Sequence, residues 1–233
     1  MAATFFLAAD HRALDLDAVR ALLVASRVRE TWACYIGAAH DDDLDFAARS
    51  RAKLTSGLGL RCEAPRLSDP ALEVDAARRA ILGASLLFLD GGDTVGLVAH
   101  ARARGLHDAF AEAARGAIVV AGVSAGSCAV APFTIGYDAD ERALASPCFA
   151  MGVAEPLDVH SEDDDWAEMR LLLEAVAGRP GLAQSGIVIP SGSALVVDAL
   201  GRMSSHGRQL CERRSLGARG AWSIERIARA AAG

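Results

Sequence analysis

The chain has 233 residues, of which 52% are hydrophobic and 5% aromatic, enough apolar side chains to fill the core of a globular fold. Its 24 Lys and Arg residues and 30 Asp and Glu residues give a formal net charge of −6, and the charges are interspersed. This composition excludes a disordered chain and argues against a nucleic-acid partner, whereas a cationic small substrate stays compatible with it.

The sequence has no stretch of about 18 apolar residues, so we expect no membrane span. The five cysteines are scattered without a CxxC pair, and the N-terminus has no basic segment or cleavage site of a secretory signal. These features predict reduced thiols and a cytoplasmic location. The acidic stretch at 40–43 has no second histidine at ligand-like spacing, and no G-x-G-x-x-G follows the first strand, so we expect neither a metal nor a cofactor.

The first two-thirds of the chain alternates short apolar runs with segments of helical period. Runs typical of buried parallel strands lie at residues 4–9, 33–39, 58–64, 85–93 and 117–123. Amphipathic helices are predicted at 14–28, 43–54 and 70–82, with a helical pair across 94–115. This alternation predicts βαβ units and a doubly wound, mostly parallel α/β sheet.

The last third is less regular. Residues 170–178 have a helical period, residues 186–205 have the pattern of consecutive strands separated by turns, and residues 221–232 are predicted to form a closing helix. No linker, repeat or low-complexity segment interrupts the chain, so we expect a single α/β domain over residues 1–233.

Ser124 lies in a G-x-S-x-G pattern that directly follows the apolar run 117–123. This pattern is typical of a nucleophile elbow, in which the turn is too tight for a Cβ on either side of the serine. The alternative is that Ser124 only caps the next helix. A second glycine-rich turn, at residues 88–94, ends another predicted strand, and ligands of such sheets bind at the carboxyl ends of the strands.

A nucleophilic serine needs a histidine base and an acid that orients it. His160 follows the apolar stretch 151–159, which suggests a strand end at the same edge of the sheet as Ser124. The other histidines fall in helical patterns or open loops.

The segment 87–132, with the two glycine turns, and the histidine some three dozen residues after the serine resemble the peptidase E family of serine peptidases, which contains aspartyl dipeptidase and cyanophycinase. The resemblance extends from about residue 85 to 206. It implies a flavodoxin-like sheet akin to class I glutamine amidotransferases. It also implies that Ser124 is the nucleophile and His160 the general base. The N–H groups of Ala125 and of Gly91, in the Gly91–Gly92 turn, would form the oxyanion hole.

Two positions of the glycine turn differ from the family pattern, because Asp90 replaces its first glycine and Asp93 its asparagine. Neither change removes a backbone donor. Asp90 puts a charge near the site if its side chain points inward; otherwise it faces solvent or caps the following helix.

The triad acid is not fixed by the resemblance. Alignment on His160 selects Asp138, alignment on residues 156–157 selects Asp140, and the cyanophycinase-type pattern would suit Glu141. The acids that are not catalytic are expected in a solvated loop.

For substrate binding, the resemblance implies that an arginine after the histidine recognises the carboxylate of an N-terminal aspartate, which assigns Arg170 to this role. The alternative is an arginine on a helix surface, paired with Glu168 or Asp165. The acidic run at 162–165 either begins a solvated helix or lines the pocket, where it would favour a cationic group.

The sequence therefore predicts a serine exopeptidase for short peptides, with dipeptides that begin with Asp as the expected substrates. The alternatives are a cyanophycinase-like hydrolase of β-aspartyl peptides and a catalytically silent binding module on the same fold. Members of the family often form dimers, so the resemblance also implies a homodimer as one form of assembly.

Overall fold

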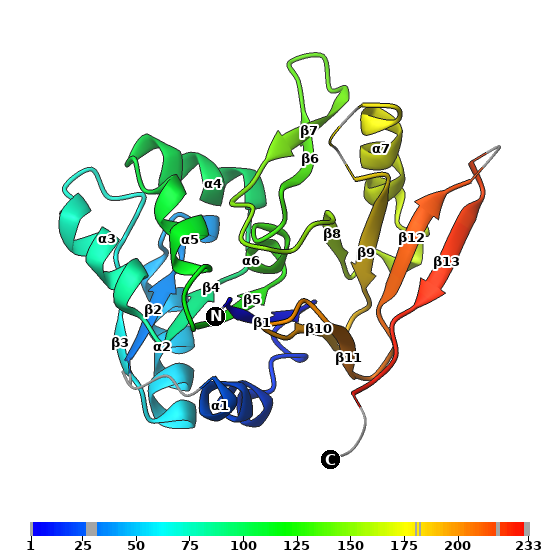
Figure 1. Cartoon of the computed structure of the whole chain (residues 1–233). Coiled ribbons are helices and arrows are strands. Elements are labelled where there is room, and N and C mark those ends of the chain that lie inside the picture. The colour runs from blue at the N-terminus through cyan, green and yellow to red at the C-terminus, as the bar shows by residue number, and fades with distance from the viewer. Residues whose placement is uncertain (1, 27–31, 180, 182, 218–219, 231–233) are drawn as a thin grey trace.

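The computed structural model describes residues 2–26, 32–179, 181, 183–217 and 220–230 (Figure 1). Within these residues a seven-stranded sheet has the order β11-β10-β1-β5-β4-β2-β3. Its strands are β1 (Thr4–Ala8), β2 (Trp32–Ile36), β3 (Arg61–Glu63), β4 (Leu86–Leu89), β5 (Val119–Val123), β10 (Ser193–Val197) and β11 (Met203–Gly207). The α-helices are α1 (Leu16–Ala25), α2 (Leu44–Leu58), α3 (Val74–Gly83), α4 (Thr94–Ala103), α5 (His107–Ala113), α6 (Ala125–Cys128) and α7 (Ala167–Val176).

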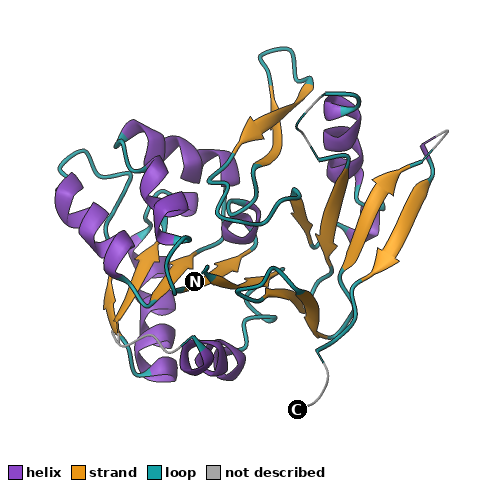
Figure 2. Cartoon of the chain, in the orientation of Figure 1, coloured by secondary structure: helices purple, strands orange, loops and turns teal. Residues whose placement is uncertain are grey.

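The five strands from β1 to β3 in this order run parallel. β10 pairs antiparallel with β1, and β11 pairs antiparallel with β10 at the edge of the sheet. All residues of β1, β4 and β5 are buried, because helices cover both faces of the sheet (Figure 2). Apolar side chains of α1 and α2 pack on one face, and those of α3, α4 and α5 pack on the other. The predicted doubly wound, mostly parallel α/β fold is confirmed.

Aspartates begin three of the helices that flank the sheet. Asp15, Asp43 and Asp93 accept hydrogen bonds from N–H groups in the first turns of α1, α2 and α4, which otherwise have no acceptor inside the helix. Gly59 ends α2 with φ 71°, a left-handed conformation that favours glycine. These local signals explain why the helix positions could be predicted closely.

A four-stranded sheet with the order β13-β12-β9-β8 forms a second layer beside the large sheet (Figure 1). Its strands are β8 (Leu157–Val159), β9 (Ser185–Ile189), β12 (Glu212–Leu216) and β13 (Trp222–Arg226). A separate hairpin consists of β6 (Phe133–Tyr137) and β7 (Ala143–Pro147). The hairpin and β12 were not predicted from the sequence.

The closing helix predicted over residues 221–232 is wrong where the structure describes the segment. Residues 222–226 form β13, which pairs antiparallel with β12 in a register that places Arg214 opposite Ile224. An ion pair between Arg213 and Glu225, at 2.8 Å, joins the same two strands. Cross-strand pairing therefore outweighs the local helical pattern. Residues 231–232 lie outside the described residues.

None of the helices in the described part of the chain is long and apolar enough to cross a membrane.

Candidate active site

Ser124 lies at a sharp turn between β5 and α6. Its backbone has φ 50° and ψ −116°, a strained conformation for a residue with a side chain. A Cβ at Gly122 would lie 2.7 Å from the Ser127 nitrogen, and one at Gly126 would lie 2.1 Å from the Leu89 oxygen. The turn therefore requires a glycine on each side of the serine, as a nucleophile elbow does.

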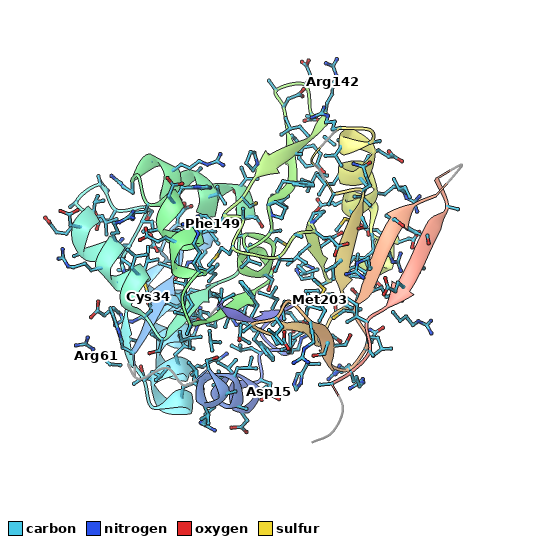
Figure 3. All side chains as sticks on the ribbon, viewed as in Figure 1. Asp15, Cys34, Arg61, Arg142, Phe149 and Met203 are labelled. Carbon is cyan, nitrogen blue, oxygen red and sulfur yellow. The ribbon has the colours of Figure 1, made fainter. Side chains whose placement is uncertain are left out.

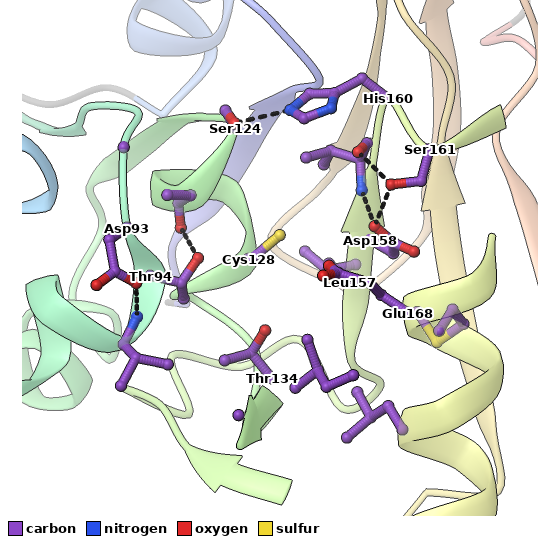
Figure 4. A pocket seen from close by; sticks show the side chains of 18 of the residues that line it. Asp93, Thr94, Ser124, Cys128, Thr134, Leu157, Asp158, His160, Ser161 and Glu168 are labelled. Atoms are coloured by element: carbon purple, nitrogen blue, oxygen red, sulfur yellow. Dashed lines mark hydrogen bonds between the residues drawn. The ribbon is translucent and has the colours of Figure 1, made fainter. Parts of the chain in front are cut away.

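The Ser124 hydroxyl does not cap helix α6, which removes the alternative interpretation of the motif. Its Oγ lies 2.9 Å from Nε2 of His160 (Figure 4). His160 directly follows β8, and its N–H donates to the Ile189 oxygen of β9 at 3.0 Å. The structure thus brings together the two residues that the sequence assigned as nucleophile and base. A hydrogen bond between serine and histidine is the geometry needed for removal of the serine proton.

Asp138, Asp140 and Glu141 lie in the loop between β6 and β7. Asp138 accepts hydrogen bonds from the N–H groups of Asp140 and Arg142, at 2.9 Å each, and Asp140 pairs with Arg142 at 3.3 Å. All four side chains are exposed, and Figure 3 shows Arg142 at the outer tip of the hairpin. The structure does not bring these acids to His160, because they close the hairpin turn.

Glu162 is a different acid near His160. It begins a 3₁₀ turn, Glu162–Asp164, two residues after the histidine. Its Oε1 accepts a hydrogen bond from the Ser191 N–H at 3.1 Å, and its buried Oε2 has no hydrogen-bond partner among the described residues. Burial alone would raise the pKa of Glu162, but the Ser191 contacts and the nearby His160 hold it below its usual value. Within the described residues no carboxylate forms an ion pair with His160.

The glycine turn after β4 presents one free backbone donor to the site. The Gly91 N–H, which the sequence assigned to the oxyanion hole, donates to Asp90 Oδ1 at 2.8 Å. The Asp93 N–H donates to the Ala39 oxygen at 2.6 Å. Of residues 91–93, Gly92 is therefore the one whose N–H has no acceptor in the described part of the chain, and it lines the same cavity as Ser124 and Ala125. Ala125 is the first residue of α6, where an N–H has no acceptor inside the helix.

Asp90 points inward, behind the glycine turn. It is fully buried, with Oδ1 3.1 Å from His11 Nε2 and Oδ2 accepting a hydrogen bond from the Tyr35 hydroxyl at 2.8 Å. Burial raises its pKa, but the contacts with His11, Ser50, Tyr35 and Gly91 outweigh this effect and lower it. Asp90 thus stays ionised and fixes the turn from the side opposite to the cavity.

Arg170, predicted to bind substrate, takes part in packing α7 against the second sheet. Its guanidinium lies 4.6 Å from the centre of the Trp222 ring, pairs with Asp165 at 3.1 Å and donates to the Gly220 oxygen. It is not among the residues that line the cavity beside Ser124. Asp165 also pairs with Arg214 at 2.9 Å.

The acidic run 162–165 therefore has mixed roles. Glu162 faces the histidine side, Asp163 and Asp164 are exposed, Asp164 accepts from the Ala167 N–H at the start of α7, and Asp165 pairs with arginines. None of these four side chains lines the cavity. Of the two interpretations of this run, a solvated helix start describes it better than a lining of the pocket.

The cavity beside Ser124 has a volume of about 640 Å³ and lies between α4, α6, β6, β8 and α7. This is the usual size of a small-ligand site. Its ionisable lining residues are Asp93, Cys128, Asp158, His160, Glu168 and the exposed Tyr137. No lysine or arginine of the described residues lines it. Among the described residues no group of three His, Cys, Asp or Glu side chains is close enough to hold a metal ion.

The family model of peptidase family S51 matches residues 12–198. The chain belongs to peptidase family S51. The match spans both glycine turns, Ser124 and His160, and it confirms the resemblance found in the sequence.

Two solved structures are similar to the fold of this S51 chain. A peptidase from an acI-B1 Actinobacterium has a TM-score of 0.75 and 14% sequence identity, with 98% of this chain and 95% of that chain covered. A candidate peptidase E protein from Listeria monocytogenes EGD-e has a TM-score of 0.65 and 13% identity, with 90% of this chain and 100% of that chain covered. At these identities the likeness concerns the fold alone. A search of the curated proteins returns no match.

Proposed function

We propose that this S51 peptidase is a serine exopeptidase that hydrolyses short peptides through Ser124 and His160. The observation that carries the proposal is the 2.9 Å contact between Ser124 Oγ and His160 Nε2 at a strained elbow. The cavity volume of about 640 Å³ supports a substrate of a few residues rather than a long chain.

In the proposed mechanism, Ser124 Oγ attacks the scissile carbonyl carbon while His160 Nε2 takes the hydroxyl proton. The N–H groups of Gly92 and Ala125 donate to the oxygen that becomes negative in the tetrahedral intermediate. His160 then gives its proton to the leaving amine, and water hydrolyses the acyl-enzyme with His160 again as base. Two backbone donors of this kind typically stabilise the transition state by several kcal/mol.

A serine-directed fluorophosphonate probe tests this function directly. We expect wild-type protein to incorporate about one probe per chain, because His160 activates the hydroxyl, and Ser124→Ala to incorporate none. Intact-mass spectrometry measures the stoichiometry, and Ser127→Ala, which removes a buried hydroxyl three residues away, is the matched control. Wild-type protein that stays unlabelled would favour a silent binding module on the same fold.

We further propose Glu162 as the acid that favours the protonated form of His160 during the reaction, in place of Asp138, Asp140 or Glu141. The position of Glu162 two residues after His160 and its lowered pKa, to which the nearby His160 contributes, support this assignment. Since the two groups are not in direct contact, the effect acts through space or through a rotation of the free Oε2.

Glu162→Gln should lower kcat by about 10- to 100-fold, less than the roughly 10⁴-fold cost of disabling an acid that is bonded directly to the base. The glutamine keeps an oxygen for the Ser191 N–H, so the change removes mainly the charge. Asp138→Asn, which preserves the acceptor of the hairpin turn, should leave kcat unchanged. Steady-state kinetics of both variants on a cleaved dipeptide distinguishes Glu162 from Asp138. A loss of kcat in Asp138→Asn, with none in Glu162→Gln, would assign the triad acid to the hairpin instead.

The predicted preference for substrates with an N-terminal aspartate depends on Arg170 as the residue that binds the aspartate carboxylate. The engagement of this residue with Asp165, Trp222 and Gly220 argues against that specificity, and the acidic lining of the cavity argues against it independently. The proposed substrate class is therefore short peptides without an acidic first residue. The cytoplasmic location and the homodimer stay predictions.

A further inference from the structure

Asp158 is a buried carboxylate in the wall of the active-site cavity. It lies on β8, two residues before His160, and its exposed fraction is 8%. Its Oδ1 accepts hydrogen bonds from the Val159 N–H at 2.8 Å and from the Ser161 hydroxyl at 3.1 Å (Figure 4). Its Oδ2 is buried and has no hydrogen-bond partner among the described residues. Buried carboxylate oxygens are normally paired. Oδ2 of Asp158 is therefore in a position to accept a hydrogen bond from a bound ligand.

The surroundings of Asp158 disfavour its ionised form. Its pKa is raised from 3.8 to about 6, mainly by burial and also by the charge of Glu168, although the Ser161 hydroxyl and the N–H groups of Val159 and Met169 act in the opposite direction. At neutral pH the side chain is still mostly ionised. A positive group bound beside it would stabilise the ionised form and lower the pKa again.

The rest of the lining fits a long cationic side chain. Glu168 and Asp93 are the other carboxylates of the cavity, and no lysine or arginine of the described residues lines it. The lining also includes the apolar side chains of Cys128, Ile135, Leu157, Met169 and Leu172. Apolar walls that lead to a buried carboxylate match a methylene stem that ends in a charged group.

The spacing indicates which positive group of a peptide reaches Asp158. Residues two apart in an extended chain are separated by about 7 Å, so the Cα of Asp158 lies about that far from the Cα of His160, which directly follows β8. The α-ammonium of an N-terminal residue stays within two bonds of the carbonyl carbon at Ser124. A lysine or arginine side chain extends across the distance.

We propose that this cavity binds the side-chain ammonium or guanidinium of the substrate residue whose carbonyl Ser124 attacks, with Asp158 as its specificity-determining partner. The inference rests on the proposed function for the identity of the reacting serine. The binding itself is independent of turnover, so the two claims can be tested apart.

The first test measures binding to the Ser124→Ala protein by isothermal titration calorimetry, with L-lysinamide and L-norleucinamide as probes. The two differ by the terminal ammonium, and both carry the α-ammonium. We expect L-lysinamide to bind about 10- to 100-fold more tightly, the range of a hydrogen bond between charged groups. Equal affinities would overturn the proposal and assign recognition to the α-ammonium.

The matched variant is Asp158→Asn, combined with Ser124→Ala. The asparagine oxygen still accepts from Val159 and Ser161, and removal of a buried charge should leave the stability equal or higher. We expect the preference for L-lysinamide to vanish in this variant and, in the parent protein, to decrease as the pH falls below about 6. Asp163→Asn, which alters an exposed acid outside the cavity, should keep the preference. Preference retained in the Asp158 variant would overturn the assignment.

The second test compares kcat/KM of the wild type for Lys-Leu and norleucyl-Leu. Faster cleavage of Lys-Leu, lost in Asp158→Asn mainly through KM, is the expected result. Equal cleavage of both peptides, with no binding preference, would reject the subsite and keep the peptidase. Selective binding of L-lysinamide without cleavage of any peptide would keep the subsite and reject the peptidase.

Discussion

Ser124→Ala and His160→Ala should each lower kcat/KM for a cleaved dipeptide by roughly 10⁴-fold or more, and the double variant should be no slower than the slower single variant. Each change disables the same step, because His160 has no proton to take without the serine hydroxyl and the hydroxyl is a weak nucleophile without the base. The 2.9 Å contact between the two side chains is the structural basis for this non-additive result. The measurement is steady-state kinetics on all three variants beside the wild type.

A histidine outside the cavity provides the control for this experiment. His100 lies on α4 and pairs with Asp41 at 2.9 Å, so His100→Ala should keep full activity. Thermal unfolding should show that the variants at 124 and 160 are folded, since neither side chain belongs to the apolar core. Activity within tenfold of wild type in either catalytic variant would contradict the mechanism.

Gly92→Ala should abolish activity and lower the free energy of unfolding by about 3 kcal/mol or more. Gly92 has φ 138°, and a Cβ there would lie 2.0 Å from the Ala39 oxygen, which is backbone and cannot rotate away. The turn must therefore move, and the N–H that we propose for the oxyanion hole moves with it. Urea denaturation and dipeptide kinetics measure the two effects.

Gly91→Ala is the matched control on the same turn. A Cβ at Gly91 would lie 3.4 Å from the Ser124 Cβ and 3.5 Å from the Val123 oxygen, which are ordinary contact distances. We expect this variant to lose less than about 1 kcal/mol of stability. Equal losses in both variants would show that the turn is not held at Gly92 as the structure describes.

The sequence predicted the parts of the fold and site that depend on neighbouring residues. The apolar runs, the helical periods and the Gly122–Gly126 pattern are local features, and they led to the sheet, the helices and Ser124. His160 was found because it follows a short apolar run that ends at the same edge. Ser124 and His160, which the structure places in contact, were therefore both identified from the sequence.

The remaining site assignments depended on contacts between distant segments. Asp138 and Asp140 were selected by counting positions, but an unpredicted hairpin carries them away from His160. Arg170 has the right chemistry for a carboxylate, yet Trp222, 52 positions later, determines where its guanidinium lies. The roles that we propose for Asp158 and Gly92 were not predicted from the sequence, although each residue has a local signal, as the chain neighbour of His160 and as the second glycine of the turn.

The proposed nucleophile and its base belong to different sheets. Ser124 extends from β5 of the seven-stranded sheet and His160 from β8 of the four-stranded one, so no ladder of backbone hydrogen bonds sets the distance between them. That distance depends on how the two layers pack and on the short connection from β9 to β10, where Asp10 accepts from Gly192 and Glu162 from Ser191. The rate of peptide hydrolysis should therefore depend on how the two sheets pack against each other. A loosening confined to the smaller layer would silence the enzyme while most of its circular-dichroism signal persists.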